Sequence, residues 1–78
     1  MLKVLIVDDD AYARNDLKNI MNWGKNGFKL LGEASDGRTA IDMIKKNTPD
    51  IIITDINMPI MSGIALIDYI RANFPHVK

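Results

Sequence analysis

The chain has 78 residues, enough for one small domain, and its ten lysine and arginine residues balance ten aspartate and glutamate residues. A chain without net charge lacks the basic surface used for nucleic-acid binding, so we expect this segment to bind no nucleic acid. The absence of cysteine excludes disulfides and thiolate metal sites, and no apolar run approaches the ~20 residues of a membrane span. We therefore expect a cytoplasmic protein that makes no membrane contact.

The first predicted strand covers residues 2–7 and runs directly into three acids, Asp8, Asp9 and Asp10. After them, the pattern predicts an amphipathic helix from residue 11 to about residue 22, with Asp10 as its cap. Its expected buried face consists of apolar residues at helical spacing: Ala13, Leu17, Ile20 and Met21.

The second predicted strand covers residues 28–34 and is less apolar than the first, which indicates an edge strand. A second helix follows it, with Ser35 or Asp36 as the cap. The expected buried stripe of this helix is Ala40, Ile41, Met43 and Ile44.

The third predicted strand consists of three isoleucines and Thr54, a composition typical of a strand buried on both faces. Asp55 follows it directly, and a loop containing Pro59 leads to a third helix capped by Ser62 and stopped by Pro75. The expected buried face of this helix is Ile64, Leu66, Ile67, Ile70 and Phe74.

Alternating strands and helices predict an α/β fold with a parallel sheet and right-handed crossovers. The two most apolar strands belong in the middle, so we expect the spatial order 2-1-3, with the first helix on one face and the other two on the opposite face. Because parallel strands end at the same edge, Asp8, Asp9 and Asp55 should form one acidic pocket. Carboxylates without nearby histidine or cysteine favour Mg²⁺, and a carboxylate beside Mg²⁺ can accept a phosphoryl group.

Three segments of the sequence, at residues 7–10, 32–37 and 49–63, resemble the receiver domain of two-component response regulators. The resemblance implies a flavodoxin-like three-layer fold, with Asp55 as the phosphoacceptor for a sensor histidine kinase. It also implies that Asp8 and Asp9 bind Mg²⁺ together with Asp55 and the backbone carbonyl of Asn57. The segment from Trp23 to Phe28 is similar to receivers attached to AraC-type DNA-binding output domains, which implies a role in transcription regulation.

A complete receiver has two more strand–helix units, so the resemblance identifies residues 1–78 as the N-terminal part of such a domain, truncated after the third unit. The family's switch Ser or Thr and its conserved Lys have no counterpart here, and Ser62 stands where the family more often has Asp. We therefore expect phosphoryl acceptance by this fragment to be impaired.

Two alternatives belong to other functional classes. One is a structural or oligomerising fragment without phosphoryl chemistry, and we expect a homo-oligomer through the exposed edge of the strand at 51–54 or through the bare sheet face. The other is a phosphatase of the haloacid-dehalogenase type, whose nucleophile motif Asp55-Ile56-Asn57 loosely resembles. That motif requires a second Asp where Asn57 stands.

Overall fold

The structure is a computed structural model that describes residues 1–20, 22–58 and 60–78. Strands and helices alternate along the chain, as the sequence predicts. In chain order they are β1 (Leu2–Val7), α1 (Ala11–Ile20), β2 (Phe28–Ala34), α2 (Gly37–Lys46), β3 (Ile51–Thr54) and α3 (Gly63–Asn73). No helix in these described ranges has the length and apolar character needed to cross a membrane.

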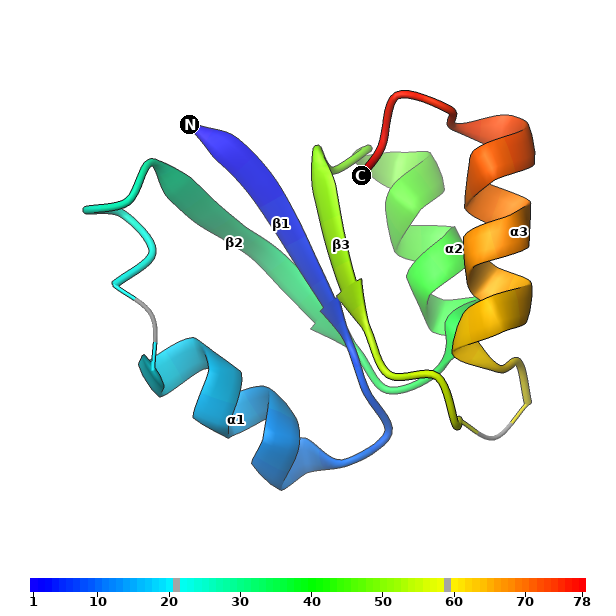
Figure 1. Cartoon of the computed structure of the whole chain (residues 1–78), viewed down its shortest axis with the longest axis horizontal. Helices are drawn as coiled ribbons and strands as arrows, with labels where there is room; N and C mark the ends of the chain where they lie inside the picture. The colour runs from blue at the N-terminus through cyan, green and yellow to red at the C-terminus, as the bar shows by residue number, and fades with distance from the viewer. Residues whose placement is uncertain (21, 59) are drawn as a thin grey trace.

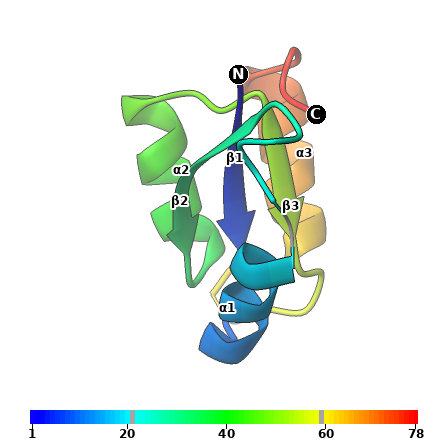
Figure 2. The same ribbon diagram turned by 90° about the vertical axis from the view of Figure 1, so that its left-hand side faces the viewer.

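The three strands form one parallel sheet in the order β2-β1-β3, which confirms the predicted order. Val7 at the end of β1 pairs with Ala34 on one side and with Thr54 on the other, so the three strands end together. Helix α1 lies on one face of the sheet, while α2 and α3 lie side by side on the other (Figures 1 and 2). The predicted distribution of helices is therefore confirmed.

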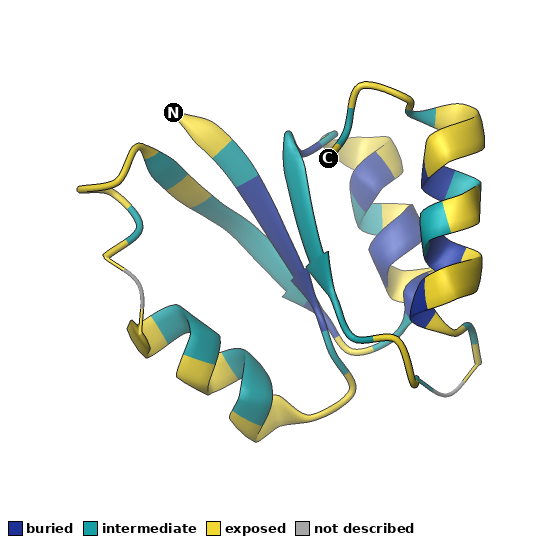
Figure 3. Ribbon diagram, in the orientation of Figure 1, coloured by how far each residue is buried: buried dark blue, intermediate teal, exposed yellow. Residues whose placement is uncertain are grey.

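The hydrophobic core lies between the sheet and the α2–α3 face (Figure 3). Alternate residues of β1 point into it, because successive side chains of a strand face opposite sides. Its buried members are Leu5, Val7, Ala34, Ala40, Ile41, Ile44, Leu66 and Ile70. The predicted stripe of α2 is thus confirmed, with Met43 half-buried beside it.

Side-chain caps fix where the helices begin. The Asp36 carboxylate accepts the Thr39 amide at 2.8 Å, and the Ser62 hydroxyl accepts the Ala65 amide at 3.2 Å. Asp10 likewise accepts the Tyr12 amide at 2.9 Å. These bonds satisfy amides that have no partner within the helix, so the three predicted caps are confirmed.

Helix α1 departs from its prediction in its buried face. Its described residues are Ala11–Ile20, Met21 lies outside the described residues, and Asn22 is not helical. Ile20, predicted to be buried, is 77% exposed, and α1 contains no fully buried residue. The reason is that α1 shares its face of the sheet with no other described helix, so no described helix covers the side of Ile20 away from the sheet.

Two further burial predictions are wrong. Ile64 is 58% exposed because it lies outside the arc of α3 that contains Leu66 and Ile70. All four residues of β3 are half-buried rather than buried on both faces, because β3 is an outer strand of the described sheet.

The outer edge of β3 is partly occupied by the last residue of the chain. The Ile52 amide donates to the Lys78 carbonyl at 2.7 Å, and the Lys78 amide donates to the Asp50 carbonyl at 3.0 Å. This pattern begins a parallel ladder on the side of β3 away from β1. The prediction that the outer edge of β3 is unpaired is therefore wrong at the start of the strand, where Lys78 pairs with it.

Candidate metal centre

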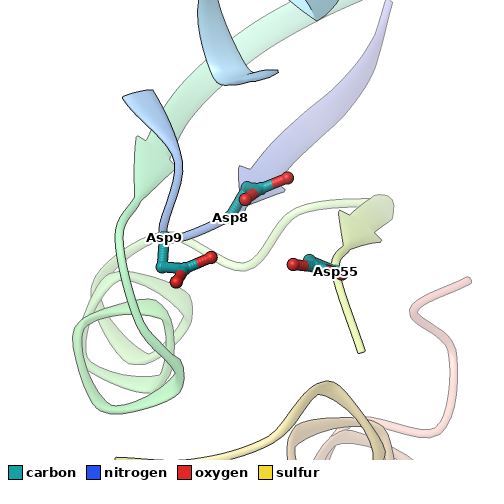
Figure 4. A group of neighbouring side chains, drawn as sticks. All are labelled: Asp8, Asp9 and Asp55. Atoms are coloured by element: carbon teal, nitrogen blue, oxygen red, sulfur yellow. The ribbon is translucent and has the colours of Figure 1, made fainter. Parts of the chain in front are cut away.

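Three carboxylates meet at the carboxyl end of the sheet. Asp8 and Asp9 follow β1, and Asp55 follows β3, and the ends of these strands are neighbours because Val7 pairs with Thr54. One carboxylate oxygen from each acid lies within 4.8 Å of the others (Figure 4). The structure therefore brings together the three acids that the sequence predicts to form one pocket.

The sheet holds the main chain of this site. The Asp8 amide donates to the Ala34 carbonyl at 3.0 Å, and the Asp55 amide donates to the Val7 carbonyl at 2.9 Å. Each of these two acids extends the sheet hydrogen bonding by one residue beyond its strand. Their Cα positions are consequently set by the strand pairing and not by a loop.

Short hydrogen bonds also orient the carboxylates. Oδ1 of Asp8 accepts the Asp10 amide at 2.9 Å, and Oδ1 of Asp55 accepts the Ile56 amide at 2.8 Å. One oxygen of each carboxylate is thereby held by the local backbone, which fixes the direction of the other. Asp8 and Asp55 are half-buried, whereas Asp9 is exposed.

The donor set suits a hard divalent cation. Three carboxylates within reach of one another supply oxygen ligands only, the type that Mg²⁺ prefers, and exposure of Asp9 leaves room for water ligands. Asn57 lies two residues beyond Asp55 and is exposed. Its role as a carbonyl ligand stays a prediction.

The packing of Gly63 against Asp55 was not predicted from the sequence. Gly63 is the buried first residue of α3, and its amide donates to the Ile56 carbonyl at 2.7 Å. A Cβ at this position would overlap the Asp55 carbonyl oxygen. The same carbonyl accepts the Thr54 hydroxyl at 2.9 Å, so α3 and β3 together confine the Asp55 main chain.

An ion-pair network of Arg14, Lys18 and Glu33 beside Asp8 was also not predicted from the sequence. Arg14 Nη1 donates to the Asp8 carbonyl at 2.6 Å, and Arg14 Nε donates to Glu33 Oε1 at 2.9 Å. The other Glu33 oxygen lies 2.6 Å from Lys18 Nζ. Hydrogen bonds from Lys18 and then from Arg14 hold the pKa of Glu33 below its ordinary value. The available signal was the four-residue spacing of the two cations on one helix and an acid interrupting an apolar strand.

The chain is similar to many known proteins of one family. The family model for the response regulator receiver domain matches residues 4–78. The chemotaxis protein CheY of Thermotoga maritima is 45% identical over 76 residues, which are 97% of this chain and 62% of that protein. The crystal structure of a two-component transcriptional regulator AraC from Clostridium phytofermentans is 37% identical, with a TM-score of 0.92, over 100% of this chain and 63% of that one.

A third similar structure is the CheX-CheY-BeF3-Mg²⁺ complex from Borrelia burgdorferi. It is 32% identical, with a TM-score of 0.85, and the match covers 97% of this chain and 57% of that one. The chain thus spans about three fifths of each of these three relatives.

Proposed function

The chain belongs to the response regulator receiver domain family, and from that premise we propose that Asp55 accepts a phosphoryl group from a sensor histidine kinase. The observation that carries the proposal is the convergence of the Asp8, Asp9 and Asp55 carboxylates at the end of two adjacent strands. Receiver domains serve two-component signalling, so phosphoryl acceptance is the chemistry that such a site would perform.

In the proposed reaction, an Asp55 carboxylate oxygen attacks the phosphorus of the kinase's phosphohistidine. The new P–O bond gives an acyl phosphate while the P–N bond breaks, and its electron pair stays on the imidazole nitrogen. Because Asp55 Oδ1 accepts the Ile56 amide, the second carboxylate oxygen would be the one that attacks. Mg²⁺ would be held by Asp8, Asp9, Asp55 and the Asn57 carbonyl. The ion would neutralise negative charge on the oxygens of the transferred phosphoryl group.

Two comparisons support this proposal. The Borrelia burgdorferi CheY structure contains BeF3 and Mg²⁺, and the Clostridium phytofermentans relative is a two-component transcriptional regulator. We therefore propose an Mg²⁺-dependent receiver within a longer regulator, whose output domain binds DNA. Self-association of the 78-residue chain through the β3 edge is a further part of the proposal.

The experiment is an intact-mass measurement of the 78-residue chain with a small phosphodonor, with and without Mg²⁺. We expect slow, partial addition of one phosphoryl group that requires Mg²⁺ and disappears in Asp55→Asn. The reaction is expected to be slow because the family's Lys and Ser or Thr have no counterpart in these residues. Asp68→Asn, an exposed acid of α3 outside the cluster, is the matched control and should react as the original chain does.

Three outcomes would count against parts of this proposal. No addition at saturating donor would favour a structural fragment. Rapid, complete labelling lost in Asp55→Asn would contradict the expected impairment and require another cation near the phosphate. Continuous release of inorganic phosphate, many turnovers per chain, would instead favour the phosphatase alternative.

A further inference from the structure

The turn between β1 and α1 carries two of the three acids, so whatever holds this turn sets the shape of the site. Asp8 is the junction between the strand and the turn. Its amide donates to the Ala34 carbonyl of β2 at 3.0 Å. Its carbonyl accepts a hydrogen bond from Arg14 Nη1 at 2.6 Å.

Arg14 is itself fixed at a second point. Its Nε donates to Glu33 Oε1 at 2.9 Å, and its side chain is only 15% exposed. The guanidinium therefore bridges the end of β2 and the Asp8 main chain with two donors of one rigid, planar group. Because the guanidinium is planar and rigid, the bond from Nε to Glu33 also fixes the direction in which Nη1 donates.

Lys18 shares Glu33 with Arg14 but makes no described contact with the turn. Its Nζ lies 2.6 Å from Glu33 Oε2, one helical turn beyond Arg14 on the same face of α1. The two side chains thus carry the same charge, lie on the same helix and pair with the same carboxylate. They differ in that only Arg14 has a described hydrogen bond to Asp8.

We propose that Arg14, anchored by Glu33, is a positioning residue that holds the Asp8 main chain so that the Asp8 and Asp9 carboxylates face Asp55. This inference rests on the proposed Mg²⁺ site and assigns a role to a residue that does not touch the ion. Hydrogen-bond partners that orient metal ligands commonly change metal affinity by about 10- to 100-fold.

Charge and geometry predict opposite effects, which makes the proposal testable. Removing a positive charge near three carboxylates strengthens cation binding if the effect is purely electrostatic. Removing a positioning contact weakens binding. A loss of Mg²⁺ affinity on neutralising Arg14 therefore cannot come from the change in charge.

The test compares Arg14→Gln with its matched control Lys18→Gln by calorimetric Mg²⁺ titration. We expect about tenfold weaker binding for Arg14→Gln, and unchanged or slightly tighter binding for Lys18→Gln. Asp8→Asn provides the reference for direct loss of a ligand. Equal affinities for Arg14→Gln and Lys18→Gln would overturn the positioning role.

A second measurement does not depend on Mg²⁺. The Asp10 amide, which donates to Asp8 Oδ1, reports on the turn through its chemical shift and its hydrogen exchange. We expect both to change in Arg14→Gln and not in Lys18→Gln in metal-free protein. If the original chain binds no Mg²⁺, the proposed metal site fails, whereas these amide signals still decide whether Arg14 positions the turn.

Arg14→Lys is the second variant, for use if Arg14→Gln does not fold, because it retains the positive charge beside Glu33. A single ammonium group, however, does not reproduce the fork that joins Glu33 to the Asp8 carbonyl. We expect Mg²⁺ affinity and the Asp10 amide signal to change in the same direction as in Arg14→Gln. An Arg14→Lys protein identical to the original in both measurements would contradict the proposal.

Discussion

Gly63 packs so closely against the Asp55 main chain that there is no room for a side chain at this position. We expect Gly63→Ala to lower the free energy of unfolding by about 1–3 kcal/mol and to weaken Mg²⁺ binding, because its Cβ would overlap the Asp55 carbonyl oxygen. The control is Gly24→Ala, whose Cβ would meet Met1 Cε at 3.7 Å, an ordinary van der Waals contact, and no other atom of the described residues within 4 Å beyond its chain neighbours. That change should stay within about 0.5 kcal/mol in urea unfolding. Equal effects of the two substitutions would show that α3 does not constrain Asp55.

The three acids were predicted from the sequence, whereas the contacts of Arg14 with Asp8 and of Gly63 with Asp55 were not. Asp8, Asp9 and Asp55 follow apolar strands, and the ends of parallel strands meet at one edge of a sheet, so their proximity follows from topology alone. The Arg14 and Gly63 contacts depend on the rotation of α1 and on the path of the loop before α3. These are tertiary details that local residue patterns do not encode.

Helices α1 and α2 have the same length but contribute very differently to the core. Helix α2 buries Ile44 completely, whereas the last residue of α1, Ile20, is 77% exposed. We expect Ile44→Ala to cost about 2–5 kcal/mol of unfolding free energy, because it leaves a cavity in the core. Ile20→Ala should change stability by less than about 0.5 kcal/mol.

Urea unfolding of the two variants, followed by circular dichroism, measures this contrast. Both substitutions replace a helical isoleucine by alanine, so differences in helix propensity largely cancel. Equal losses of stability would mean that α1 packs as tightly as α2.

Element starts were easier to predict than buried faces. Apolar runs and capping residues act within a few positions of the sequence, so all three helix starts agree with the prediction to within one or two residues. Burial of a side chain, in contrast, depends on another element of the fold packing against it. Ile20 and Ile64 fit an apolar pattern in the sequence but are exposed, because nothing described lies opposite them in the folded chain.

At the level of the whole chain, the outer side of β3 is only partly covered in the described structure. Lys78 pairs with its first residues, and beyond this contact a groove of about 270 Å³ lies between β3 and α3. Its lining is largely apolar and consists of Ile52, Thr54, Ile67, Ile70, Arg71, Val77 and Lys78. Main-chain groups at a strand edge combined with apolar side chains favour pairing with another strand.

We therefore expect the 78-residue chain to self-associate through this edge, with a strand of a second copy continuing the ladder that Lys78 begins. Ile52→Lys should weaken the association, because it places a charge in the apolar groove. The control is Ile64→Lys, since Ile64 is an exposed isoleucine of α3 outside the groove lining and should leave the association unchanged. Sedimentation velocity over a range of protein concentrations measures the outcome. A compact, folded monomer at every concentration would contradict pairing at β3, and a dimer weakened equally by both substitutions would move the interface to another surface.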